Sequence, residues 1–170
     1  MKIYYASSIR GVNSKEKSFF DGKIVEYLLH HGFVLGGSII NGTFNPFGET
    51  KLEDSEIHDR EVNWLRESNI LIAEVTYPSL GVGYIISKAI QYKKKIMCLY
   101  MPSGKELSAM VKGNKDLKVV EYNTIEEAKS LIGKFLSNLE EKIDSTYTIT
   151  EINKEAFNGL ITGKKKYKVL

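Results

Sequence analysis

Short apolar runs and longer amphipathic segments alternate along most of the chain. The apolar runs are rich in β-branched and aromatic residues and predict five strands, at 2–6, 33–35, 70–75, 95–100 and 117–122. Segments with apolar residues every three or four positions predict helices, at 14–31, from 54 or 55 to 68, from the turn at 78–83 to about 92, and from 124 onward. Strands separated by helices are typical of βαβ units. We therefore expect a three-layer α/β fold with a five-stranded parallel sheet, of the flavodoxin-like or Rossmann-like type.

Smaller signals refine this plan. Thr124 and Glu127 have the spacing of a capping box, which predicts the start of the last helix. A further helical turn is expected at 106–111. Tyr4 and Tyr5 are neighbours on the first strand, so one ring is expected to face each side of the sheet, and core filling is the default interpretation of both.

Two polar, glycine-bearing segments follow the first and third strands. They are SIRG at 8–11 and PSLGVG at 78–83. In a flavodoxin-like strand order, 2-1-3-4-5, these strand ends are neighbours, and ligands bind in the crevice beside them. Gly81 and Gly83 allow close approach of the backbone, and the free N–H groups of a helix start favour negative charge. Together the two segments predict a site for an anionic ligand.

Arg10 and Glu61 are candidates for chemistry, each with a plain alternative. The Arg10 guanidinium can bind a phosphate through two hydrogen bonds, with Ser8 as a further donor; the alternative is a surface arginine at a strand exit. Glu61 shares a helical face with Ile57, Trp64 and Leu65. Such a carboxylate is either a partly buried acid or base, or a side chain that reaches past the apolar stripe to solvent.

Composition excludes several classes of protein. The chain has 170 residues and a net charge of +3, from 24 basic and 21 acidic residues, which is too mild for a binder of nucleic-acid polymers. No apolar run has membrane-spanning length, and no Cys, His or Asp spacing matches a metal site. Cys98 lies in an apolar run, as expected of a buried thiol. A single cysteine and no leader segment before the first strand predict a cytoplasmic protein.

Four segments carry a resemblance to a known family. They are Tyr4 with SIRG at 8–11, IHDREVNWL at 57–65, AEVTYPSLGVGY at 73–84 and SGKELSAMVKG at 103–113. In this order they resemble the 2′-deoxynucleoside 5′-phosphate N-hydrolases, relatives of the nucleoside 2-deoxyribosyltransferases. The resemblance spans about the first 140 residues. We therefore expect a domain at 1–144 and an extension of unknown role at 145–170. Three alternatives stay open for this extension: it pairs across a dimer, it covers the site, or it is disordered.

The resemblance implies an activity and a set of site residues. The family cleaves the N-glycosidic bond of deoxyribonucleoside 5′-monophosphates to give free base and deoxyribose 5-phosphate, as a homodimer without metal or organic cofactor. Tyr4 matches a tyrosine beside the reacting sugar, and Glu61 matches a catalytic aspartate. Ser108 matches a serine that the neighbouring subunit contributes to the phosphate site, and Met110 an adjacent contact. The other expected substrate- and phosphate-binding residues are Ser8, Ile9, Arg10, Gly11, Ser79, Gly81 and Gly83.

Ile85 departs from the family pattern. The resemblance places it where the family has the glutamate that attacks the anomeric carbon, and an isoleucine has no lone pair with which to do so. Ser7 also replaces a family glycine, with less expected consequence. The first interpretation is an N-glycosyl hydrolase or deoxyribosyltransferase with altered chemistry, in which Glu61 activates water and Tyr4 assists. The second is a nucleotide-binding or regulatory homologue without catalysis. A third, a structural subunit that keeps only the fold, is disfavoured by the retained phosphate segments.

Overall fold

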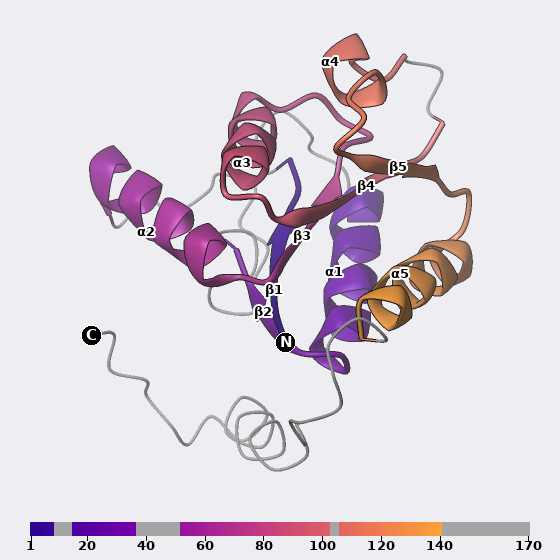
Figure 1. Ribbon diagram of the computed structural model, residues 1–170. Helices are drawn as coiled ribbons and strands as arrows, with labels where there is room; N and C mark the ends of the chain where they lie inside the picture. Colours follow the sequence, from indigo (N-terminus) through magenta and orange to yellow (C-terminus); the bar gives the residue numbers. More distant parts are fainter. Residues whose placement is uncertain (9–14, 37–51, 103–105, 141–170) are drawn as a thin grey trace. The chain divides into compact units, whose positions relative to one another are not determined.

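The computed structural model describes residues 1–8, 15–36, 52–102 and 106–140 (Figure 1). The chain divides into one compact unit at Met1–Leu136 and a second at Ser137–Leu170. The first unit contains all five strands and all of the predicted site residues. The expected domain boundary at residue 144 lies outside the described residues and stays a prediction.

The described strands form one parallel sheet. They are β1 (Lys2–Ala6), β2 (Phe33–Leu35), β3 (Ile70–Glu74), β4 (Lys95–Tyr100) and β5 (Lys118–Glu121). Their order is β2-β1-β3-β4-β5, and every neighbouring pair is parallel. This confirms the predicted flavodoxin-like arrangement. The winding reverses between β1 and β3, so the carboxyl ends of these two strands lie side by side.

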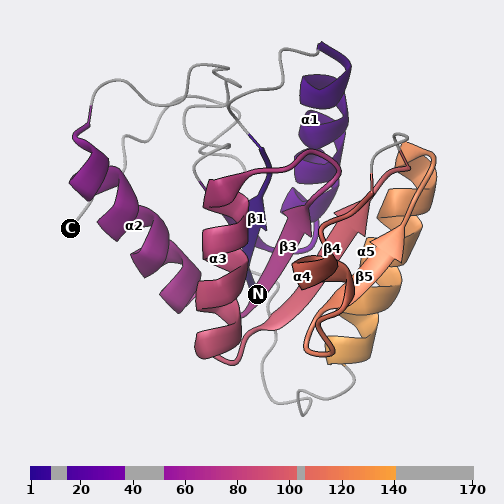
Figure 2. The same ribbon diagram turned by 90° about the horizontal axis from the view of Figure 1, so that it is seen from above.

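Helices cover both faces of this sheet. They are α1 (Lys15–Leu29), α2 (Asp54–Glu67), α3 (Leu80–Gln91), the single turn α4 (Ala109–Lys112) and α5 (Ile125–Glu140). α2 and α3 lie on one face, and α1 and α5 on the other (Figures 1 and 2). The α/β fold class is therefore confirmed, with most boundaries within two residues of those predicted. In the described part of the chain, no helix is long and apolar enough to cross a membrane.

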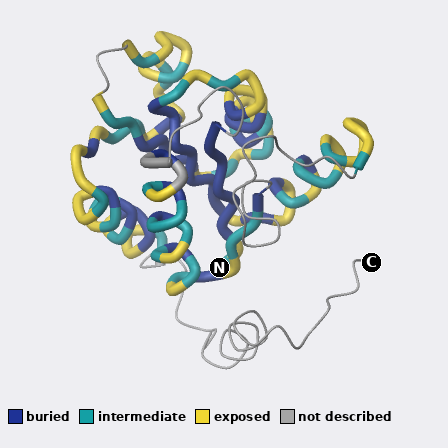
Figure 3. The backbone as a smooth tube through the Cα atoms, turned by 180° about the vertical axis from the view of Figure 1, so that it is seen from behind, coloured by how far each residue is buried: buried dark blue, intermediate teal, exposed yellow. Residues whose placement is uncertain are grey.

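Successive side chains of the buried strands point alternately to the two faces of the sheet, so the protein has one apolar core on each face. Tyr4 and Ala6 of β1 and Ala73 of β3 belong to an apolar cluster with residues of α2 and α3, among them Leu65 and Ile85. The residues between them on the strands face α1 and α5 instead, because successive side chains of a strand point to opposite faces. The three central strands, β1, β3 and β4, are the most deeply buried part of the described chain, whereas the edge strands β2 and β5 are partly exposed (Figure 3).

The start of α5 differs in one detail from the predicted capping box. The Thr124 hydroxyl accepts a hydrogen bond from the Glu127 backbone N–H at 3.2 Å, as expected. The Glu127 carboxylate accepts from the backbone N–H of Asn123 at 2.9 Å. Glu127 therefore reaches one residue further back than the motif requires, and a backbone donor outside the helix is satisfied instead.

Candidate functional site

The neighbouring carboxyl ends of β1 and β3 bring together residues from three segments. Tyr4 and Ala6 pair with Leu71 and Ala73 across the two strands. Ser8 lies two residues after the end of β1 and is buried. The chain after β3 leads through four residues to Ser79, where α3 begins. The sheet order thus places Ser8 and Ser79 at the same edge of the sheet, beside the strand that carries Tyr4.

Tyr4 and Glu61 form a hydrogen-bonded pair between β1 and α2, on the face of the sheet that α2 and α3 cover. The Tyr4 hydroxyl donates to Glu61 Oε2 at 2.5 Å, and the Arg60 guanidinium donates to Glu61 Oε1 at 2.9 Å. Of the two orientations that the helical pattern left open, the carboxylate therefore takes the inward one. Burial raises the pKa of Tyr4 well above its ordinary range, and the negative charge of Glu61 raises it further. The tyrosine remains protonated and orients the carboxylate as a donor.

The start of α3 leaves its backbone accessible. Ser79 is the N-cap, and its hydroxyl accepts a hydrogen bond from the Val82 backbone N–H at 3.4 Å. A side chain added at Gly83 would meet nothing within 4 Å, and one at Gly81 would meet only the Ser79 hydroxyl, at 3.9 Å. The two glycines are therefore not required by packing within the described chain. They leave open space over N–H groups that can bind an anion.

Ile85 packs into the apolar core of the α2–α3 face. It is 8% exposed and belongs to the same cluster as Tyr4, Val82 and Ile86. The position is therefore close to the candidate site in the fold, and its side chain fills space without presenting any polar atom.

The remaining predicted site residues are of two kinds. Ile9, Arg10 and Gly11 lie outside the described residues, so their predicted roles stay predictions. Ser108 is the exposed N-cap of α4, without a side-chain capping bond. Met110, on the same turn, is 84% exposed. Both α4 residues therefore lie on the surface of the first unit, available to another molecule.

A buried polar cluster on the opposite face was not predicted from the sequence. Asp21 of α1 is fully buried and accepts hydrogen bonds from the Tyr5 hydroxyl at 2.6 Å and the Ser7 hydroxyl at 3.2 Å. It also forms an ion pair with Lys17, one helical turn earlier. The sequence held a signal for this cluster, because Asp21 lies between Phe20 and Ile24 in the apolar stripe of α1.

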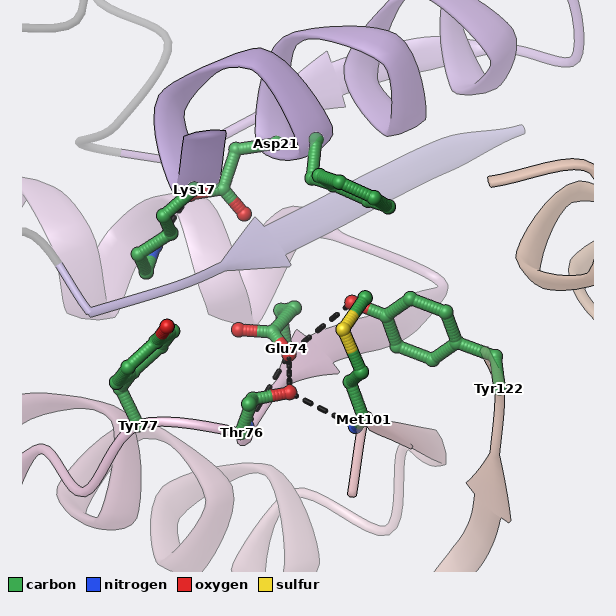
Figure 4. A pocket seen from close by; sticks show the side chains of 8 residues that line it. Lys17, Asp21, Glu74, Thr76, Tyr77, Met101 and Tyr122 are labelled. Carbon is green, nitrogen blue, oxygen red and sulfur yellow. Dashed lines mark hydrogen bonds and ion pairs between the residues drawn. The ribbon is translucent and has the colours of Figure 1, made fainter. Parts of the chain in front are cut away.

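Glu74, at the end of β3, belongs to the same buried region. Its Oε1 accepts hydrogen bonds from the Thr76 backbone N–H at 3.1 Å, from the Thr76 hydroxyl, and from the Tyr122 hydroxyl at 3.3 Å (Figure 4). Its Oε2 is buried and has no hydrogen-bond partner among the described residues. Burial raises the pKa of Glu74, and the nearby Asp21 carboxylate adds to this, although the bonds from Thr76 oppose it.

Other reactive side chains have structural explanations. Cys98 is completely buried, and burial raises the pKa of its thiol to about 12, so it is not a nucleophile at neutral pH. His58 joins α2 to α3 through a 2.9 Å hydrogen bond between Nε2 and the Tyr84 hydroxyl, and its Nδ1 lies 2.9 Å from Asp59. Within the described ranges, no group of three His, Cys, Asp or Glu side chains could hold a metal ion.

Comparison with known proteins identifies relatives over most of the chain. No family model matches the sequence. The chain is 39% identical over 142 residues to the 5-hydroxymethyl-dUMP N-hydrolase of Tetraodon nigroviridis, covering 81% of this chain and 99% of that protein. The corresponding protein of Danio rerio is 39% identical over 142 residues, covering 82% of this chain and 98% of the relative. A Nematostella vectensis sequence described as 2′-deoxynucleoside 5′-phosphate N-hydrolase 1 is 40% identical over 144 residues, or 81% of this chain and 95% of that sequence.

A solved structure supports the fold independently of these sequences. The CMP N-glycosidase BcmB of Clostridium botulinum superposes with a TM-score of 0.58 at 13% sequence identity, covering 79% of this chain and 99% of that one. At that identity the likeness concerns the fold alone. The assignment of this chain to a family therefore rests on the sequence relatives, since they match along almost their whole length at about 40% identity. The chain belongs to the family of the 2′-deoxynucleoside 5′-phosphate N-hydrolases.

Proposed function

We propose that this protein binds deoxyribonucleoside 5′-monophosphates in the crevice between β1 and β3 and hydrolyses their N-glycosidic bond, with Glu61 as the active carboxylate. The observation that carries the proposal is the hydrogen bond from Tyr4 to Glu61, which holds a carboxylate on the α2–α3 face of the sheet, beside β1. The relatives' names, which describe hydrolysis of the same bond, support it.

The 5′-phosphate is proposed to bind where the two glycine-bearing segments meet. Ser79 begins α3, and the space over Gly81 and Gly83 is open, so backbone N–H groups of the first turn can donate to phosphate oxygens. The segment Ser8, Ile9, Arg10 and Gly11 follows the neighbouring strand and is proposed to supply the guanidinium and further donors.

The proposed reaction needs no nucleophilic residue at position 85. Glu61 takes a proton from a water molecule, whose oxygen attacks the anomeric carbon as the bond to the base nitrogen breaks. The bonding electrons leave with the base, which takes up a proton, and the products are free base and deoxyribose 5-phosphate. Direct attack by water on an oxocarbenium-like centre is the route of inverting glycosidases. Tyr4 keeps the carboxylate pointed inward.

The proposed assembly is a homodimer in which Ser108 reaches the neighbouring phosphate site. Two large apolar side chains support it, since Leu80 at the start of α3 is 96% exposed and Met110 on α4 is 84% exposed. Exposed apolar residues of this size are typical of contact surfaces. Analytical ultracentrifugation tests the proposal: a dimer is expected, and Met110→Asp should weaken it.

A cytoplasmic location is also proposed for this protein. It is supported by the unpaired, buried thiol of Cys98.

A second function, nucleotide binding without hydrolysis, is favoured by Ile85. Its side chain is 8% exposed and packed among apolar residues, so the position of the expected nucleophile is occupied by core packing. Losing a catalytic nucleophile commonly lowers the rate by several orders of magnitude, on the order of 10⁴ or more. Such a protein would still bind the monophosphate through its phosphate segments.

One experiment separates the two functions. The protein is incubated with each common deoxyribonucleoside 5′-monophosphate and with 5-hydroxymethyl-dUMP, and released base is measured by chromatography, with calorimetry for binding. Hydrolysis that is lost in Glu61→Gln and kept in Glu67→Gln, an exposed carboxylate on the same helix, supports the enzyme. Binding without turnover supports the second function, and Ile85→Glu should then introduce some hydrolysis. If the protein neither binds nor cleaves, the proposal is wrong.

A further inference from the structure

A pocket of about 90 Å³ lies beside the buried polar cluster, at the carboxyl edge of the sheet (Figure 4). It opens on the face opposite to the Tyr4–Glu61 pair. Ala73 and Val75 both pack in the α2–α3 core, so Glu74, which lies between them, points to the α1 side. The pocket is therefore separate from the crevice proposed for the nucleotide.

Glu74 presents one unsatisfied acceptor to this pocket. The side chain is 3% exposed, and all its hydrogen bonds from described residues go to Oε1, from Thr76 and Tyr122. Oε2 has no partner within the described chain, and it points into the space between Lys17 and Tyr77 (Figure 4). A buried acceptor without a donor is costly, so a ligand that donates a hydrogen bond here is favoured.

The walls of the pocket restrict what that ligand can be. The rings of Phe20, Tyr77 and Tyr122 and the Met101 thioether line it, which suits a flat aromatic molecule. The polar groups favour an uncharged one, because a cation would meet the Lys17 ammonium and an anion would meet Glu74. Asp21 already accepts bonds from Tyr5, Ser7 and Lys17.

The size of the pocket further restricts the class of ligand that can bind in it. At about 10–15 Å³ for one water-sized group, this volume holds roughly six to nine such groups. A single six-membered ring with small substituents has that size, whereas a whole nucleotide does not fit.

We propose that this pocket is a second binding site, for an uncharged pyrimidine-type heterocycle that donates an N–H hydrogen bond to Glu74 Oε2 and stacks against Tyr77. The proposal depends on the pocket alone and goes beyond the proposed function, because it requires no hydrolysis. Tyr77 lies two residues before Ser79, so the bound ring would lie close along the chain to the proposed phosphate site.

Nuclear magnetic resonance of the ¹⁵N-labelled protein tests the proposal. Uracil, which has N–H donors, is titrated to about 10 mM, enough to detect a dissociation constant of about 1 mM. We expect shifts at the backbone amides of Thr76, Tyr77 and Met101. Unsubstituted pyrimidine has the same ring without an N–H donor and serves as the matched ligand control, which should cause far smaller shifts.

Variants assign the binding to one face of the sheet. Glu74→Met removes both acceptor oxygens from a side chain of similar length and should abolish the uracil shifts, whereas Glu61→Gln, on the other face, should keep them. Tyr77→Ala leaves the buried carboxylate in place and should weaken binding about tenfold, as for loss of one stacked ring. Absence of shifts, as in a pocket filled by water, overturns the proposal. So does equal binding of pyrimidine, uracil binding that survives in Glu74→Met, or uracil binding that disappears in Glu61→Gln.

Discussion

Removing the Asp21 carboxylate should cost a large part of the stability of the first unit. Asp21→Ala deprives the buried Lys17 ammonium of this carboxylate, and it takes the acceptor from the Tyr5 and Ser7 hydroxyls. Breaking a buried ion pair by removing one partner typically costs about 3–5 kcal/mol. Native domains are stable by only about 5–15 kcal/mol in total. The loss should therefore be visible in any unfolding experiment.

Urea unfolding followed by circular dichroism measures this loss directly. Thermal unfolding should show the same loss: at about 2–4 °C per kcal/mol for a chain of this length, the melting temperature should fall by roughly 10 °C. Asp59→Ala is the matched control, because that carboxylate is 76% exposed and bonded only to His58 among the described residues, and little change is expected. The double variant Lys17→Met with Asp21→Leu should recover most of the loss, because it removes the charges of both partners together.

A small effect would refute this reasoning. If Asp21→Ala loses less than about 1 kcal/mol, the size of an exposed ion pair, then the Lys17 ammonium reaches water and the cluster is not a buried one. A double variant no more stable than Asp21→Ala would show that the loss comes from the Tyr5 and Ser7 hydroxyls, and not from the charge.

Three further outcomes are expected. Burial raises the pKa of Glu74 in the folded state, so this group's contribution to stability should be lost as pH rises from the ordinary pKa of 4.5 through the raised pKa. Urea unfolding should therefore show the free energy of unfolding of Glu74→Gln increasing relative to that of the wild type across this pH range. A difference between the two proteins that does not depend on pH would contradict the prediction. Gly83→Ala should stabilise α3 by about 0.5–1 kcal/mol but weaken binding of the monophosphate, as measured by calorimetry. Gly22→Ala in α1 is the control, because a side chain added there also meets nothing within 4 Å, and it should stabilise the protein without affecting binding. Cys98 should react with a disulfide reagent only as fast as the protein unfolds, and fast labelling of the native protein would contradict its burial.

The sheet and its switch point could be predicted from the sequence because they depend on local periodicity. Five apolar runs separated by amphipathic segments leave few topologies, and the order β2-β1-β3-β4-β5 is the usual one for such a chain. The helical pattern alone could not decide the orientation of Glu61, because a residue on an apolar stripe can turn inward or reach solvent at the same helical angle. Only the match to the family's catalytic aspartate indicated the inward orientation. The Tyr4 hydroxyl, 57 positions away in the sequence, decides it.

The position of Asp21 in the apolar stripe of α1 was the one signal for the buried polar cluster, and it could not show which residues Asp21 would meet. Glu74 is the one charged residue in an apolar run, and in the sequence it looks simply like the end of a strand. Its burial depends on Tyr122, which lies 48 positions further along the chain. Lys17 and Asp21 form an ordinary i,i+4 pair in the sequence, and only the packing of α1 against β1 distinguishes a buried pair from a surface one.

The two adjacent tyrosines of β1 have a consequence for how this chain can evolve. Tyr4 donates to Glu61 on one side of the sheet, and Tyr5 donates to Asp21 on the other. Either contact can be altered by a substitution without touching the other. A single inserted or deleted residue in β1 would instead reverse the direction of both rings at once. Substitutions in this strand are therefore tolerated more readily than a change in its length, because the two rings must reach carboxylates on opposite faces of the sheet, Glu61 and Asp21.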